Sequence, residues 1–220
     1  KYQKQTLVDQ LSAIRVPEVI TPKFALNAKA SHRSLVSICD GTIGYRENHA
    51  VLKGIQLHVH AQERIAISGD NGSGKSTLIK AILGAAQLVK QGNWDLPGAR
   101  DIGYLDQHYA TLLPEKKVVD LVTDVMPQTS YLDIRKHLND FLFRKNEEVE
   151  ASVSTLSGGE KARLSLALIA AQTPRLLILD EMTNNLDLET RAHVIEVLQA
   201  YPGALIVISH DLDFLERINI

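Results

Sequence analysis

The sequence predicts an α/β fold with a mainly parallel core sheet, a smaller antiparallel sheet and a helical subdomain. Three observations support this prediction. A glycine-rich loop stands between the apolar stretch 64–68 and a helical pattern, the stretch 55–59 alternates between apolar and polar residues, and the runs 176–179 and 205–208 are continuously apolar. Such runs are typical of central strands buried on both faces of a parallel sheet. Strands that alternate with helices predict a ligand site at the carboxyl edge of that sheet.

The composition is that of an ordinary globular protein. The 220 residues are 45% hydrophobic and carry a formal net charge of −2, which suits one large domain or a domain with a smaller layer. No apolar run approaches the roughly 18 residues that a membrane-spanning helix needs. The single cysteine, Cys39, excludes an intrachain disulfide and a cysteine-clustered metal site, and we expect it to be a strand residue in the hydrophobic core. This cysteine usage fits a reducing, cytoplasmic location.

The amino-terminal segment differs from the rest of the chain. Residues 1–33 contain six Lys or Arg and two acidic residues, and their apolar residues recur at helical spacing before Pro17. We expect residues 1–34 to form a helical, basic interdomain linker and residues 35–220 to form the folded domain. The charge indicates either a polyanionic neighbour or a solvated linker. The chain begins without methionine, which suggests a fragment of a longer protein.

From Leu35 the pattern changes to strands. The alternation in the stretch 55–59 is typical of an antiparallel strand with one solvated face. His58 and His60 lie on its polar side, so we expect them at the surface and not as metal ligands. The next apolar stretch, 64–68, indicates a buried strand that leads into the glycine-rich loop.

The glycine-rich loop matches the pattern G-x-x-x-x-G-K-[ST], in which backbone amides surround nucleotide phosphates. Its glycines let successive N–H groups approach phosphate oxygens closely, and the helix that begins near Lys75 adds the positive end of its dipole. The alternative, a glycine-rich turn before an unrelated helix, leaves the flanking strand and apolar helix unexplained. The loop therefore predicts binding of ATP or GTP. The predicted phosphate-binding residues are Gly69, Asp70, Asn71, Gly72, Ser73, Gly74, Lys75, Ser76 and Thr77.

Residues from about 112 to 172 predict a helical subdomain. A short strand at 102–105 precedes it, and apolar residues then recur at helical spacing through about residue 143. The charged stretch 144–150 is typical of a loop. A further helix is expected to run to about Ala171 and to end near Pro174.

The apolar run 176–179 ends in two acidic residues, Asp180 and Glu181. Beside a phosphate loop, such a strand end supplies a magnesium site, with Ser76 as one ligand and Asp180 as the other. Glu181 would then orient and deprotonate the attacking water, a role worth about 10² to 10⁴ in rate. Without the loop, two solvated carboxylates would be the simpler interpretation.

The stretch from Leu156 to Glu160, LSGGE, resembles the signature sequence of the ATP-binding cassette (ABC) superfamily. With the phosphate loop and the acidic pair, it makes residues 35–211 similar to an ABC ATPase domain. The resemblance implies ATP and Mg²⁺ as cofactors and assigns three further roles. Tyr45 would stack on the adenine, Gln107 would sense magnesium and the attacking water, and His210 would contact the γ-phosphate. Each of these residues alone could be an ordinary turn or strand-end residue, but their order is the order that the family uses.

The resemblance also implies that one domain is insufficient. In the family, the helix head that carries the signature contacts the γ-phosphate bound by a different domain, so two domains enclose two ATP molecules head to tail. The implied partner is a second ABC ATPase domain, in tandem or as a second copy of this chain. The residues that the resemblance places at this second contact are Ser157, Gly158, Gly159, Glu160 and Asp187.

Several stretches resemble the ABC-F branch, whose tandem-domain members act on ribosomes. These are LSGGEKARLSL at 156–166, TNNLD at 183–187 and HDLDFL at 210–215. The resemblance implies a ribosomal or RNA partner for residues 1–34, the position of the connector in that branch, and suggests the second domain of a tandem protein.

Two other classes share the catalytic residues. An ATP-binding subunit of an ABC membrane transporter would act on a membrane permease. A DNA-repair or chromosome-type ATPase usually separates the halves of its site with long insertions, and this chain has them in one compact domain. Met182 and Asn185 depart from the family pattern, where proline and histidine are usual.

Overall fold

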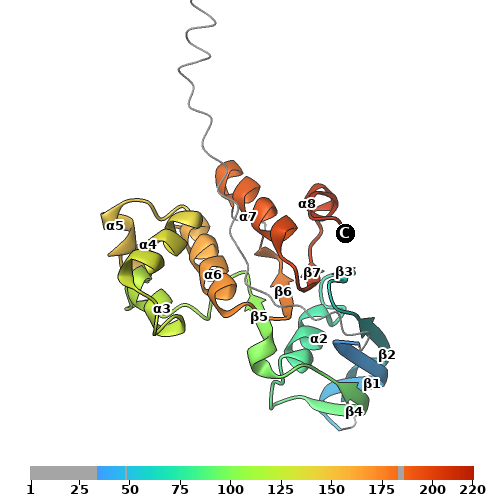
Figure 1. Cartoon of the computed structure of the whole chain (residues 1–220). Coiled ribbons are helices and arrows are strands. Elements are labelled where there is room, and N and C mark those ends of the chain that lie inside the picture. Colours follow the sequence, from blue (N-terminus) through green and yellow to red (C-terminus); the bar gives the residue numbers. More distant parts are fainter. Residues whose placement is uncertain (1–33, 48, 183–185) are drawn as a thin grey trace, which may run out of the picture.

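The computed structural model describes residues 34–47, 49–182 and 186–220. The expected linker, residues 1–34, therefore lies outside the described residues apart from Ser34. Figure 1 shows an antiparallel sheet (β1, β2 and β4) on one side, a group of helices (α3 to α6) on the other, and a parallel sheet with α7 and α8 near it. This arrangement confirms the predicted fold class.

The antiparallel sheet has the strand order β2-β1-β4. It consists of β1 (Val36–Arg46), β2 (His49–Val59) and β4 (Val89–Asp95). His58 and His60 are exposed, as the alternation predicted. Cys39 lies in a strand, as expected, but the expectation that it lies in the core was wrong. Ile38 takes the buried side of β1, so Cys39 is half-buried on the outer side, with its Sγ 3.9 Å from His58 Nε2.

The second sheet is parallel, with the strand order β3-β7-β6-β5. The two central strands, β6 (Leu176–Asp180) and β7 (Ala204–Ile208), are buried along almost their whole length, which confirms the prediction from their apolar runs. β5 (Ile102–Leu105) forms one edge. β3 (Arg64–Ile67) forms the other and is half-buried to exposed, so the expectation of a buried strand was wrong. An edge strand has a neighbour on one side only, and its sequence does not reveal this position.

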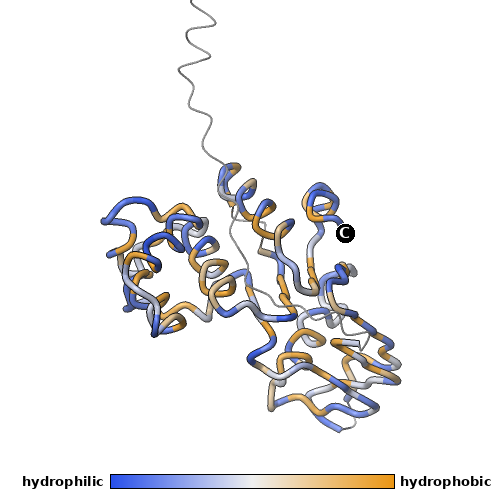
Figure 2. The backbone as a smooth tube through the Cα atoms, viewed as in Figure 1, coloured by the Kyte–Doolittle hydropathy of each residue, from blue (hydrophilic) through white to orange (hydrophobic). Residues whose placement is uncertain are grey.

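Two hydrophobic cores meet at the parallel sheet. Leu176 and Ile178 of β6 face a core shared with the antiparallel sheet and with α2 (Lys75–Ile82), whereas Leu177 and Leu179 face a core formed with the other helices. Alternate residues of β6 thus serve opposite cores, which explains why the strand is apolar without interruption. Figure 2 shows hydrophobic residues through the central strands and hydrophilic ones on the outer turns near α5.

The helical group contains α3 (Val118–Val125), α4 (Tyr131–Asp140), α5 (Asn146–Val149) and α6 (Gly158–Gln172). The expectation of a loop at 144–150 was wrong in part, because α5 lies within it. Glu148 Oε2 accepts a hydrogen bond of 3.0 Å from the N–H of Lys145, and Val149 is fully buried. A local cap and one core contact are sufficient for a single helical turn in a charged sequence.

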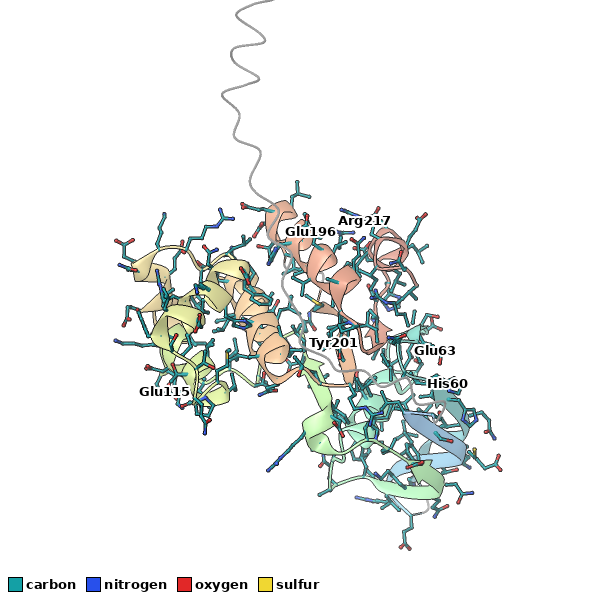
Figure 3. The ribbon with its side chains drawn as sticks, in the orientation of Figure 1. His60, Glu63, Glu115, Glu196, Tyr201 and Arg217 are labelled. Atoms are coloured by element: carbon teal, nitrogen blue, oxygen red, sulfur yellow. The ribbon has the colours of Figure 1, made fainter. Side chains whose placement is uncertain are left out.

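Two further helices, α7 (Leu188–Ala200) and α8 (Leu212–Arg217), end beside β3. The Arg64 guanidinium of β3 donates to the carbonyl of Ile218 at 2.7 Å, of Leu198 at 2.9 Å and of Tyr201 at 3.1 Å. Figure 3 labels Tyr201 and Arg217 at these two helix ends. The carbonyls carry the negative ends of the helix dipoles, so one half-buried cation satisfies acceptors of both helices. Burial lowers the pKa of Arg64 from its usual value.

We expect Arg64→Leu to lower the free energy of unfolding by about 2 to 4 kcal/mol, because it leaves several partly buried carbonyls without their donor. Urea denaturation followed by circular dichroism would measure the loss. Arg100→Leu, at an exposed position, is the matched control and should change the value by less than about 0.5 kcal/mol. Equal effects of the two substitutions would show that Arg64 does not hold the two helix ends.

Candidate functional site

The glycine-rich loop connects β3 to α2, as predicted. Gly74 occupies the N-cap position of α2 with φ 96°, and a Cβ at this residue would lie 2.8 Å from Leu52 Cγ on β2. Both the left-handed backbone and the close strand therefore require glycine. The loop brings the first amides of α2 to the carboxyl edge of the parallel sheet, the end of a helix that attracts anions.

A cavity of about 180 Å³ opens at this edge. It is lined mainly by the loop and the first turn of α2, with Glu181 from the end of β6 and Val51 from β2. The structure thus brings Glu181 to the phosphate loop, although the two are more than a hundred residues apart in the sequence. Val51 was missed by the sequence reasoning, because only the β1–β2 pairing brings this residue to the loop. The loop residues at the cavity are Asn71, Gly72, Gly74, Lys75, Ser76 and Thr77.

Lys75 supplies the positive charge of the cavity. Its ammonium donates to the carbonyl of Gly69 at 2.6 Å and to the carbonyl of Asp70 at 3.0 Å. Phosphate oxygens could replace these carbonyls as acceptors without a change in the backbone. An ammonium, a row of loop amides and the start of a helix form a donor set that fits a triphosphate.

Glu181 has an unusual backbone. Its φ is 49°, in the left-handed region, and its N–H donates to the carbonyl of Ile208 on β7 at 3.0 Å. A non-glycine residue in this region costs on the order of 1 kcal/mol. The hydrogen bond to β7 offsets part of this cost and turns the chain, so that Glu181 lines the cavity.

Asp180 is partly buried beside Tyr104 of β5, whose hydroxyl donates to its Oδ2 at 3.3 Å. Burial raises the pKa of Asp180, and the negative charges of Glu181 and Asp106 raise it further, against the Tyr104 hydrogen bond and Lys75. Burial raises the pKa of Tyr104, and the negative charges of Asp180 and Asp106 raise it further, so its hydroxyl keeps the proton that it donates. A carboxylate and the Ser76 hydroxyl are oxygen ligands of the type that Mg²⁺ prefers.

Tyr104 was not singled out from the sequence. Parallel pairing places Tyr104 opposite Ile178 and thus on the same sheet face as Asp180, two residues further along β6. The sequence held one usable signal: an aromatic residue with a hydroxyl, three positions before Gln107, in a strand that ends at the same edge.

Gln107 follows β5 and His210 follows β7, the strands on either side of β6. Gln107 is half-buried in the turn after β5, where the Asp106 carboxylate accepts hydrogen bonds from the N–H groups of His108 at 2.9 Å and Ala110 at 3.1 Å. His210 is exposed and follows β7 after one intervening residue, Ser209. The parallel register of β5, β6 and β7 thus brings Gln107, Glu181 and His210 to one edge of the sheet.

Tyr45 lies at the end of β1 with 52% of its surface exposed. It is not among the residues that line the cavity. Its predicted contact with an adenine stays a prediction.

The LSGGE segment forms the start of α6, and its Leu156 belongs to the hydrophobic core formed with the helices. Ser157 is the N-cap: its Oγ accepts from the N–H of Glu160 at 3.3 Å, and Glu160 Oε2 accepts from the N–H of Ser157 at 2.8 Å. Burial opposes ionisation of Glu160, but the Ser157 bonds and the charge of Arg163 lower its pKa below the usual value. This capping box occupies the side chain of Glu160, one of the residues that the resemblance places at the contact with the partner's nucleotide.

Gly159 lies against the start of α7. A Cβ at Gly159 would lie 2.9 Å from Asp187 Oδ2 and 2.9 Å from Thr190 Oγ1. Asp187 is the N-cap of α7 and accepts from the N–H of Thr190 at 2.9 Å. The structure therefore places the two predicted partner-facing segments, at Gly159 and Asp187, side by side.

A sequence profile described as ABC transporter matches residues 52–184 of the chain. The chain belongs to the ABC ATPase family. It is 38% identical over 190 residues to the putative ATP-binding protein YdiF of Bacillus subtilis, covering 86% of this chain and 29% of that protein. It is 35% identical over 220 residues to the probable ATP-binding protein YheS of Haemophilus influenzae, covering 94% of this chain and 34% of that protein.

The chain therefore spans about a third of the length of these curated relatives. They are ABC-F proteins, which confirms the branch predicted from the sequence. An ABC ATP-binding domain implies nucleotide binding, and the domains of this family are generally ATPases that work in pairs.

Solved structures agree with the fold. CbiO1 of Clostridium perfringens, part of the ABC transporter complex CbiONQ, superposes with a TM-score of 0.66 at 24% identity, covering 84% of this chain and 82% of that one. A bacterial Atm1-family ABC exporter with ATP bound gives 0.67 at 21% identity, covering 96% of this chain and 41% of that one. Within residues 34–47, 49–182 and 186–220 of the present chain, no helix has the length and hydropathy to span a membrane.

We expect Tyr104→Phe to weaken magnesium-dependent nucleotide binding about fivefold, because Asp180 loses the hydroxyl that orients it, a hydrogen bond worth about 1 kcal/mol. Titration with a fluorescent ATP analogue at graded Mg²⁺ would measure the shift. Binding without Mg²⁺ should stay unchanged. Tyr131→Phe, at an exposed tyrosine, is the control. An unchanged Mg²⁺ dependence would show that Asp180 is oriented without the phenol.

Proposed function

We propose that this chain hydrolyses ATP as one of two paired ABC domains, and that the pair belongs to an ABC-F protein that acts on the ribosome. The observation that supports hydrolysis most strongly is that Lys75, Ser76 and Glu181 line the same cavity. A phosphate-binding cation, a metal-binding hydroxyl and a carboxylate base are what the reaction requires.

The loop would grip the triphosphate. Lys75 would transfer its hydrogen bonds from the carbonyls of Gly69 and Asp70 to β- and γ-phosphate oxygens. Ser76 and Asp180 would hold Mg²⁺, which would offset the charge that develops on these oxygens. Tyr104 keeps one oxygen of Asp180 occupied and so leaves the other for the metal site.

Three side chains would act on the attacking water and the γ-phosphate. Glu181 would accept the water proton, Gln107 would position the water, and His210 would donate a hydrogen bond to a γ-phosphate oxygen. The strained turn at Glu181, fixed to β7 by its N–H, keeps the carboxylate at the cavity before substrate binds. This placement reduces the reorganisation that the reaction needs.

The start of α6 would complete the site of a second domain. Its capping box uses the N–H groups of Ser157 and Glu160, so the amides of Gly158 and Gly159 are the donors that this helix start would offer to an anion. The same chain supplies one phosphate loop and one such helix start. Two domains arranged head to tail would therefore enclose two ATP molecules, with Asp187 beside each contact.

The segment 1–34 would serve as the connector between the two domains and would contact RNA. Its excess of basic residues suits phosphate contacts, whereas the whole chain has a net charge of −2. The segment lies almost entirely outside the described residues, so this part of the proposal is supported by the sequence and by the ABC-F relatives.

We expect Glu181→Gln to bind ATP normally and to stop turnover, so that a dimer held by ATP accumulates. Size-exclusion chromatography with light scattering, with and without Mg-ATP, would detect the dimer, and phosphate release would report turnover. Lys75→Ala, which removes the phosphate-binding cation, should remain monomeric under the same conditions. Phosphate release by Glu181→Gln at the parent rate would exclude Glu181 as the base.

We expect deletion of residues 1–30 from the full-length protein to weaken cosedimentation with ribosomes at least about tenfold, because several phosphate contacts would be lost. ATPase activity should change less than twofold. The sedimentation is done in ATP with the Glu181→Gln variant, and the membrane fraction is assayed in parallel. Recovery with membranes instead of ribosomes would support the transporter alternative.

A further inference from the structure

We propose that Arg191 is a positioning residue for His210, and that it connects His210 to the segment at Asp187 and Gly159 that faces the partner domain. The proposal deepens the proposed ATP hydrolysis and rests on it for the role of His210. The placement itself rests only on contacts within this chain.

Arg191 forms a two-pronged ion pair with Asp211, the residue that follows His210. Its Nη1 lies 2.6 Å from Asp211 Oδ2 and its Nη2 lies 3.0 Å from Oδ1. Nη2 also donates to Asp213 Oδ2 at 2.8 Å. The Arg191 and Asp211 side chains are only 23% and 27% exposed. Partial burial and a bidentate geometry distinguish this pair from ordinary surface ion pairs, which contribute little.

Asp211 holds the backbone on both sides of His210. Its carboxylate accepts from the N–H of Phe214 at 3.0 Å and so caps α8, while its own N–H donates to the hydroxyl of Ser209 at 3.1 Å. Ser209 is buried at the end of β7. The position of His210 therefore depends on where the Asp211 carboxylate is held, and Arg191 is the cation that holds it.

The other end of the connection is the start of α7. The N–H of Arg191 donates to the carbonyl of Asp187 at 2.8 Å, one helical turn away. Asp187 and Thr190 form the surface against which Gly159 packs. A continuous set of contacts thus runs from Gly159, which would face the partner's nucleotide, to His210, which would face this chain's own nucleotide.

The chemistry requires arginine at this position. A planar guanidinium reaches both oxygens of Asp211 and still has a donor for Asp213, whereas the single ammonium of lysine cannot keep this fork. Burial also opposes the charge on Asp211, but the Phe214 N–H and Arg191 lower its pKa below the usual value, so the pair stays ionised.

The first test measures the position of His210 without nucleotide. In protein labelled at histidine, we expect Arg191→Leu to shift and broaden the imidazole NMR signals of His210, which His210→Gln assigns by their disappearance. Arg191→Lys should give an intermediate change. Asp213→Asn is the control, because Asp213 is 69% exposed and its loss leaves the Asp211 fork intact. Unchanged His210 signals in Arg191→Leu would overturn the proposal, whatever the nucleotide assays give.

The second test measures discrimination between nucleotides. We expect Arg191→Leu to lower affinity for a nonhydrolysable ATP analogue about fivefold to tenfold and to leave ADP affinity within twofold, because His210 would contact the γ-phosphate alone. Adding Arg191→Leu to His210→Ala should cause no further loss. Equal losses for both nucleotides, or additive losses in the double variant, would overturn the proposal. If His210→Ala itself leaves the ratio unchanged, the proposed role of His210 fails instead, and the NMR result still decides the role of Arg191.

Discussion

The structure depends on the burial of β6 and β7 between two hydrophobic cores. Leu176 pairs with Ala204 and Asp180 pairs with Ile208, so both strands end at the same level. In a parallel sheet buried on both faces, the central strands carry unpaired backbone groups and polar side chains only at their ends, so the functional residues gather at the carboxyl edge. The acidic pair, the phosphate loop and His210 share this edge because the hydrophobic packing fixes the register of the strands.

The helices α2 and α6, whose starts would contact nucleotide phosphates, are capped differently at those starts. α2 begins at a left-handed glycine without a side-chain cap and carries Lys75 in its first turn, whereas α6 begins with a Ser157–Glu160 capping box. The first arrangement adds positive charge at the cavity. The second fixes the helix start with a capping box that uses the N–H groups of Ser157 and Glu160 and not those of Gly158 and Gly159. The start of α2 would bind the triphosphate by itself and therefore needs the extra cation. The start of α6 would contact a phosphate that another domain already binds, so it does not need one.

The features that the sequence predicted are local ones. The apolar runs of β6 and β7, the glycine pattern of the loop and the acidic strand end each lie within a few consecutive residues, and the structure contains all of them. The predictions that were wrong or missing depend on residues that are neighbours in space but not in the sequence. Cys39 faces outward because Ile38 takes the core side of β1, β3 is an edge strand, and β4 was missed because VKQGNWD lacks a strand alternation. The contacts of Tyr104 with Asp180 and of Arg191 with Asp211 cross between elements, so no stretch of sequence contains them.

A single element, α7, connects the halves of the domain that would act on different nucleotides. Its N-cap, Asp187, lies against Gly159, its Arg191 pairs with Asp211, and the carbonyl of Leu198 near its end accepts from Arg64. The internal hydrogen bonds of a helix resist bending more than its surface contacts resist sliding. A helix with contacts at both ends therefore shifts as a rigid body when a neighbouring element moves. A shift of α6 against a partner domain would therefore displace α7 as a unit, and the Asp211 fork would carry that displacement to His210. The geometry thus offers a physical route by which closure over one nucleotide could align the histidine at the other.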